Sequence, residues 1–130
     1  MKPLKLLLDE HISPDVAAGL RRRYPALAVH ALTEWDAGSL LGQNDFTCLA
    51  RAAAAGLTLV TYDRRTIPVL LKAWAEQGRS HGGVIFVDEK TIAPANVGGL
   101  VRALSQMYES SKYGETRKQE WADRVVFLRR

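Results

Sequence analysis

The sequence predicts an α/β fold in which a mostly parallel sheet carries helices on both faces. Short apolar segments rich in β-branched residues alternate along the chain with segments whose apolar residues recur at helical spacing. Strands and helices that alternate in this way form parallel sheets joined by right-handed crossovers. The 130 residues contain no linker and no internal repeat, so we expect a single domain over residues 1–130.

The first strand and helix are marked by a change from apolar to capping residues. Residues 4–9, LKLLLD, form an apolar run that ends in an acid. Ser13 and Pro14 then supply the N-cap and the first-turn proline of a helix that reaches about Tyr24. Residues 27–32, LAVHAL, follow as the second expected strand.

A second helix and a third strand follow the polar, glycine-containing loop that comes next. Asn44 is placed to cap a helix over residues 45–55. The apolar face expected for this helix comprises Phe46, Leu49, Ala50 and Ala53. Residues 57–62, LTLVTY, form the third expected strand.

The second half of the chain repeats the alternation. Apolar residues at helical spacing predict a helix from Ile67 to Gly78, followed by a strand over 83–88, GVIFVD. A longer helix is expected from Val97 to at least Tyr108, and residues 124–128 form the last strand. Continuous β-branched and aromatic sequence is typical of strands covered on both faces.

Composition excludes several classes of protein. Hydrophobic residues make up 47% and charged residues 25% of the chain, as in an ordinary globular domain. Cys48 is the only cysteine, which excludes an intrachain disulfide and a cysteine zinc cluster. The absence of a signal peptide core and of a membrane-span motif leads us to expect a cytoplasmic protein without membrane contact. No P-loop, dinucleotide fingerprint or nucleophile elbow occurs, and the net charge of +4 is compatible with a nucleic-acid partner.

Acidic residues stand where a parallel sheet would place a site. Asp9 and Glu10 close the first strand, Asp63 follows the third, and Asp45 opens the helix between them. Ligands of open parallel sheets bind beyond the carboxyl ends of the strands. Crowded carboxylates repel one another unless a cation lies between them, and oxygen ligands without cysteine favour Mg²⁺ or Mn²⁺.

Each of these acids also has an ordinary explanation when it is considered alone. Asp45 at a helix start complements the helix dipole. Asp9 and Glu10 fit a polar turn, and Asp63 fits either the start of a turn or an ion pair with Arg64. The position of all four acids around one expected crevice is what favours a site.

Three segments of the chain resemble the small stand-alone PIN-like domains, which are related to VapC-type toxins. They are LLLDEHISPDVAAGL, NDFTCLARAAAAGLTLVTYDRR and GGVIFVD, and the likeness extends over roughly residues 4–105. The resemblance implies a three-layer α/β/α fold and Mg²⁺- or Mn²⁺-dependent hydrolysis of phosphodiester bonds in single-stranded RNA. It also implies an antitoxin protein and a second copy of the chain as partners to test for.

Carried over to this sequence, the resemblance makes Asp9, Asp45 and Asp63 the acidic metal site, with Glu10 beside them as a further ligand. The residues that we assign to substrate binding are Thr61, Arg64, Arg65 and Trp35. The family often has a fourth acid two residues after Asp63, where this chain has Arg65. Arg65 either binds a substrate phosphate or pairs with Asp63 and displaces the metal.

Three functions therefore remain open from the sequence. The first is a metal-dependent endoribonuclease. The second is a catalytically silent PIN-like module that binds RNA or a protein, for which Arg65 is the reason. The third is a receiver-like phosphoacceptor domain, because Asp9, Glu10 and Asp63 imitate its acid pair and phosphorylated aspartate, although Asp88 ends the fourth strand where a receiver has Ser or Thr.

Overall fold

The structure, a computed structural model, describes residues 4–113 and 121–129. Its strands are β1 (Lys5–Leu8), β2 (Ala28–Ala31), β3 (Thr58–Thr61), β4 (Val84–Phe86) and β5 (Val125–Phe127). Its helices are α1 (Pro14–Arg23), α2 (Asp45–Ala54), α3 (Ile67–Glu76) and α4 (Val97–Tyr113), with one 3₁₀ turn, η1 (Trp35–Gly38). None of the helices in these ranges is both long enough and apolar enough to cross a bilayer.

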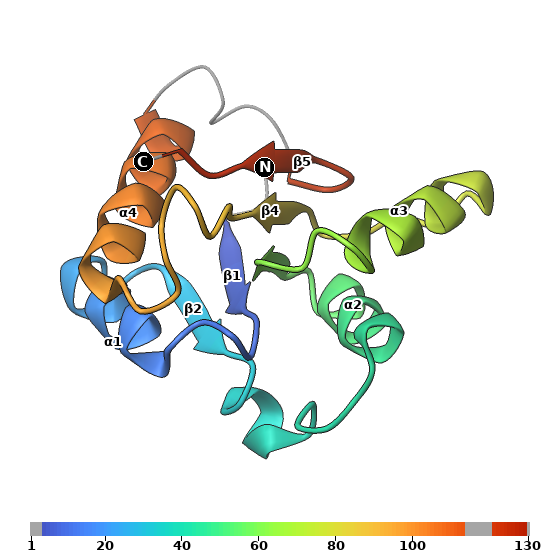
Figure 1. Cartoon of the computed structure of the whole chain (residues 1–130), viewed down its shortest axis with the longest axis horizontal. Helices are drawn as coiled ribbons and strands as arrows, with labels where there is room; N and C mark the ends of the chain where they lie inside the picture. Colours follow the sequence, from blue (N-terminus) through green and yellow to red (C-terminus); the bar gives the residue numbers. More distant parts are fainter. Residues whose placement is uncertain (1–3, 114–120, 130) are drawn as a thin grey trace.

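The five strands form one all-parallel sheet in the order β2-β1-β3-β4-β5 (Figure 1). Strand β1 pairs with β2 through Leu6 and Val29, and with β3 through Leu7 and Leu59. The direction of strand addition reverses between β1 and β3, where open α/β sheets leave a crevice at the carboxyl edge. The predicted parallel sheet is therefore confirmed, and its crevice lies beside the predicted acids.

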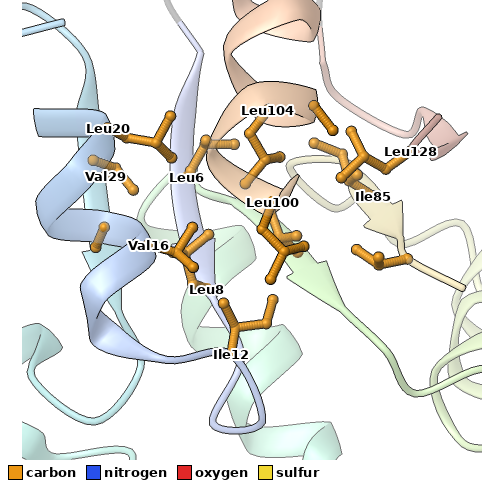
Figure 2. Close-up of a cluster of buried hydrophobic side chains, with 14 of the residues drawn as sticks. Leu6, Leu8, Ile12, Val16, Leu20, Val29, Ile85, Leu100, Leu104 and Leu128 are labelled. Atoms are coloured by element: carbon orange, nitrogen blue, oxygen red, sulfur yellow. The ribbon is translucent and has the colours of Figure 1, made fainter. Parts of the chain in front are cut away.

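Helices α1 and α4 cover one face of the sheet (Figure 2). Val16 and Leu20 of α1 and Leu100 of α4 are fully buried against this face. Leu6 and Leu8 point toward them from β1, because alternate residues of a strand face opposite sides of the sheet.

Helices α2 and α3 cover the other face. Leu49 of α2 and Trp74 of α3 are buried there. Leu7 of β1 and Leu59 of β3 pack from the sheet against the same cluster. Because both faces are covered, the strands are apolar at successive positions, and the fold is a doubly wound α/β sandwich.

Side-chain caps fix where two of the helices begin. The Ser13 hydroxyl accepts the N–H of Asp15 at 3.1 Å, and Oδ1 of Asn44 accepts the N–H of Thr47 at 2.8 Å. Both bonds satisfy donors that the first turn of a helix leaves open. The predicted caps are confirmed, and the cap at Asn44 places Asp45 at the first position of α2.

The predicted apolar face of α2 was partly wrong. Leu49 is buried as expected, and Ala50 and Ala53 pack partly buried against the same cluster, but the other buried residues of the helix are Cys48 and Ala52. Phe46 is 46% exposed and touches Trp74 only edge to face, with ring centroids 6.1 Å apart. The first turn of α2 lies at the rim of the sheet, so the helix turns a neighbouring stripe of small residues inward.

Candidate metal centre

The carboxyl edge of the sheet holds an open pocket of about 520 Å³. Asp9 follows β1 directly, Asp63 follows β3 by two residues, and Asp45 begins α2. The described residues that line the pocket are Asp9, Glu10, His11, Asp45, Tyr62, Asp63, Glu89 and Pro94. The structure thus brings together all four acids that the sequence assigned to the site.

The pocket has an excess of negative charge. Five of its described lining residues are carboxylates, and none of the described Lys or Arg residues lines it. The described ion pairs join Arg51 to Asp36, Arg64 to Asp88 and His81 to Asp123, so they leave the four predicted acids without a counter-ion. Such a group of carboxylates is costly unless protons or a cation reduce its charge.

Asp9 is held from both sides by hydrogen bonds. Its Oδ2 accepts the hydroxyl of Thr61 at 2.5 Å, and its Oδ1 accepts the N–H of Glu10 at 2.8 Å. Its own N–H donates to the carbonyl of Val60 at 2.9 Å, which extends the β1–β3 ladder by one residue. The carboxylate of Asp9 is therefore fixed relative to the two central strands.

Asp63 is held by the backbone of the turn that follows it. Its Oδ1 accepts the N–H groups of Arg65 at 2.9 Å and Thr66 at 2.8 Å. Burial acts to raise the pKa of Asp63, but the hydrogen bonds from Thr66 and Arg65 outweigh it and lower the pKa overall. Asp63 is therefore a fixed, ionised oxygen donor at neutral pH.

Asp45 has the opposite electrostatic balance. Burial is the largest cause that raises the pKa of Asp45. Its interaction with the Asp63 side chain and the negative charges of Asp63, Asp9 and Glu10 raise the pKa further. The two carboxyl groups interact, so that the pKa of Asp45 is raised while that of Asp63 is lowered. When both are ionised, the Asp45–Asp63 pair is a doubly charged oxygen site.

Thr61 links the two strand ends. It is fully buried at the end of β3, and its hydroxyl donates to Asp9 while it accepts the N–H of Asp63 at 3.0 Å. One buried hydroxyl therefore sets the relative position of two acids that lie 54 residues apart in the sequence. Thr61 does not line the pocket among the described residues, so it supports the acids from behind.

The arginines after Asp63 do not neutralise it. Arg64 pairs with Asp88 at 3.5 Å, and its guanidinium lies 5.5 Å from the ring centre of Phe127. The side chain of Arg65 is exposed, and within the described chain it makes no ion pair with Asp63. The ion-pair explanation of Asp63 is wrong for the described residues, and the role of both arginines in substrate binding stays a prediction.

Trp35 lies outside the pocket lining. It belongs to η1, packs against the cluster beneath α2 and α3, and stacks under the guanidinium of Arg51 at 5.3 Å. The structure gives the ring a packing role, while its assignment to substrate binding stays a prediction.

Four further residues line the pocket that the sequence did not assign to the site: Tyr62, Glu89, His11 and Pro94. Glu89 follows β4 and reaches the same carboxyl edge as the other acids, a position that the sheet rule predicts. Tyr62 is held at the pocket by its hydroxyl, which donates to the carbonyl of Ile92 at 2.7 Å.

The donor chemistry of the pocket fits a hard divalent cation. All candidate donors except His11 are carboxylate or hydroxyl oxygens, which Mg²⁺ and Mn²⁺ prefer. No three His, Cys, Asp or Glu side chains of the described ranges converge closely enough to enclose a metal ion. Mg²⁺ commonly keeps several waters and uses one or two carboxylates together with substrate phosphate, so the Asp45–Asp63 pair matches a hydrated ion.

Comparison of the chain with protein-family models, with curated proteins and with solved structures finds no match. The functional proposal consequently depends on the pocket, and the resemblance to PIN-like domains depends on the three short motifs.

Proposed function

We propose that the protein is a Mg²⁺- or Mn²⁺-dependent endoribonuclease of the PIN type that hydrolyses single-stranded RNA. The observation that carries this proposal is a pocket at the carboxyl edge of a parallel sheet with five carboxylates and, among the described residues, no Lys or Arg. A cation relieves the repulsion among these groups, and an all-oxygen site selects a hard one.

The same charge pattern favours a phosphate ester as the substrate. A phosphodiester is repelled by bare carboxylates, and a divalent cation bound between them reverses that effect. Arg65 is exposed and follows Asp63 by two residues, where it would contact the RNA backbone beside the reacting phosphate. Arg64 would join it only by exchanging Asp88 for a phosphate.

The residues have separable roles in this proposal. Asp45 and Asp63 would hold the cation, with Asp9 and Glu10 as the neighbouring donors. A bound divalent ion polarises the phosphate and lowers the pKa of its water. Thr61 keeps Asp9 oriented through its hydroxyl. The raised pKa of Asp45 reflects its burial and the neighbouring acids, a cost that a bound cation would relieve.

The test is cleavage of a mixed single-stranded RNA pool by purified protein with Mn²⁺ or Mg²⁺, and with EDTA. We expect cleavage that requires the metal and falls on the order of 10²-fold in Asp9→Asn. Asp15→Asn is the matched control, because Asp15 is an exposed acid in the first turn of α1 and lies outside the pocket.

Two outcomes contradict the proposal. Cleavage that persists in Asp9→Asn or in EDTA assigns the activity to a contaminant or to another site. Binding of RNA by folded protein without any cleavage supports the silent module instead, for which Arg65 at the position of a fourth acid is the reason. An antitoxin and a second copy of the chain stay predictions about partners.

One observation favours the receiver-like alternative. The strand order 2-1-3-4-5 is that of flavodoxin-like folds, to which receiver domains belong. Against it, Asp88 follows β4 and Arg129 follows β5, where a receiver has Ser or Thr and Lys. Incubation with acetyl phosphate separates the two functions: a gain of one phosphoryl group that Asp63→Asn abolishes supports the receiver, and no gain in mass excludes it.

A further inference from the structure

The two edge strands of the sheet differ in how their outward backbone groups are used. On β2, the carbonyl of Val29 accepts Nε of Arg21 at 3.0 Å, and the carbonyl of Ala31 accepts the N–H of Glu34 at 3.0 Å. Both outward carbonyls of this edge are therefore occupied. Such occupation is one way in which proteins prevent pairing at a sheet edge.

Among the described residues, nothing pairs with the outer edge of β5. Arg124 accepts from Val84 at 2.9 Å and Leu128 donates to Phe86 at 2.8 Å, so these residues face β4. Val125 and Phe127 alternate with them and direct their N–H and C=O groups outward, where no described residue bonds them. The two side chains are 47% and 58% exposed.

A pocket lies on each face of this edge. One of about 500 Å³ lies between α3 and β5 and is lined by Leu71, Ala75 and Val125, among others. One of about 260 Å³ lies between α4 and β5 and is lined by Met107 and Leu128, among others. Alternate side chains of a strand added to β5 point to opposite faces, so they would reach both pockets.

The charge around the edge is positive. Lys72 and Arg79 line the larger pocket, and Arg129 lines the smaller one. Arg64 lies over the ring of Phe127. Two acids lie near these cations: Asp88 pairs with Arg64 at 3.5 Å, and Asp123, in the larger pocket, accepts the N–H of His81 at 3.0 Å. Lys72, Arg79 and Arg129 are in no described ion pair. An acidic partner complements this surface.

We propose that β5 is the docking site of an extended acidic segment of a partner protein, which adds a sixth strand to the sheet. Strand addition explains the free backbone groups, the two flanking pockets and the charge together. Nucleic acid would satisfy the charge but not the backbone groups of Val125 and Phe127, and a second copy would bring the same cations to the edge. The proposal requires no catalytic activity, so it stands or falls separately from the proposed function.

The test begins with the full chain and a displayed library of ten-residue peptides in which apolar residues alternate with Asp or Glu. The tightest binder is labelled, and its affinity is measured by fluorescence anisotropy. Val125→Pro removes an outward N–H while leaving the ladder to β4 intact, because proline is tolerated on the open side of an edge strand. Val125→Thr is the matched control, since it keeps the N–H and a β-branched side chain.

We expect Val125→Pro to weaken binding of the peptide at least about tenfold, because the complex loses the hydrogen bond from this N–H. Val125→Thr should bind the peptide as the wild type does. A copy of the peptide N-methylated at alternate residues tests the same point without changing the protein, and it should not bind. Lys72→Glu should weaken binding of the acidic peptide.

Several results overturn the proposal. They are the enrichment of no alternating acidic peptide, equal binding by Val125→Pro, and equal binding of the N-methylated peptide. If a single-stranded RNA oligonucleotide displaces the peptide from the wild-type protein, and the Val125→Pro variant does not bind that RNA, the edge is assigned to nucleic acid. A wild-type dimer that Val125→Pro converts to a monomer in size-exclusion chromatography assigns it to a second copy.

Discussion

Thr61 has the most demanding environment of the residues around the acidic pocket. It is fully buried, and its hydroxyl is used twice, as a donor to Asp9 and as an acceptor from the N–H of Asp63. Replacing this hydroxyl by a methyl group leaves a carboxylate oxygen and a backbone N–H without their partner. Loss of a partner by a buried polar group costs more than an average hydrogen bond contributes.

We therefore predict that Thr61→Val lowers the free energy of unfolding by about 1–3 kcal/mol. It should also reduce metal-dependent cleavage, because Asp9 loses its orientation. Thr61→Ser keeps the hydroxyl and should retain most of both properties. Urea unfolding and RNA cleavage of the three proteins measure the two effects, and a Thr61→Val protein with unchanged stability contradicts the bridging role.

Among the elements, strand β4 depends most on glycine. Gly83 precedes it with a φ of +100°, a conformation that residues with a Cβ rarely adopt. A Cβ on Gly83 would lie 2.5 Å from the carbonyl oxygen of Trp121. Gly82 approaches the backbone of Leu57 in the same way. The two glycines let β4 enter the sheet between β3 and the segment that leads into β5.

Gly83→Ala should accordingly destabilise the protein by about 2–4 kcal/mol, through backbone strain and the clash with Trp121. Gly98 provides a matched comparison, since a Cβ there meets no atom within 4 Å at the start of α4. Gly98→Ala should be neutral or stabilise by up to about 1 kcal/mol. Thermal unfolding of both variants checks the pair, and equal effects would refute the close-approach argument.

For the molecule as a whole, the sequence predicts the architecture well because strand and helix signals agree with the caps. Ser13 and Asn44 mark helix starts that the structure confirms within one residue. The orientation of α2 about its own axis was less predictable. Alanines flank Leu49 on the helix surface in both directions, so the sequence does not show which neighbouring stripe is buried, and contact with the sheet decides it. The strand order also had to come from the structure, because alternation alone is compatible with several orders.

For the site, the sequence predicted which acidic residues take part, but not the hydrogen bonds that hold them. The rule on carboxyl ends located Asp9, Glu10 and Asp63, and the start of the intervening helix located Asp45. It did not reveal that backbone N–H groups, and not arginines, hold Asp63, because that depends on the path of the turn after β3. Glu89 was missed for the same reason, since its approach to the pocket requires β4 to lie beside β3.

The charge of the pocket predicts how the whole protein responds to neutralisation. The pKa of Asp45 is raised in the folded state, so its contribution to stability is present at low pH and is lost as the pH rises through that pKa. At neutral pH, Asp45→Asn should therefore raise the melting temperature in EDTA. Asp15→Asn, outside the pocket, should not.

Mn²⁺ should stabilise the wild-type protein by relieving the same repulsion. A concentration a hundredfold above the dissociation constant adds about 2.7 kcal/mol. Asp45→Asn should lose most of this gain. Differential scanning calorimetry with Mn²⁺ and with EDTA measures both effects, and a wild-type transition that Mn²⁺ does not move speaks against a cation site.

The unlike edges of the sheet also limit how copies of this chain can assemble. Growth of a filament requires β5 of one copy to meet β2 of the next, and the guanidinium of Arg21 already occupies the Val29 carbonyl on that side. Pairing of β5 with β5 uses the open edge of both copies, so it ends at two chains. The bonds from Arg21 and Glu34 to the β2 carbonyls thereby disfavour an open-ended polymer, while the described residues leave the β5 side of the sheet accessible.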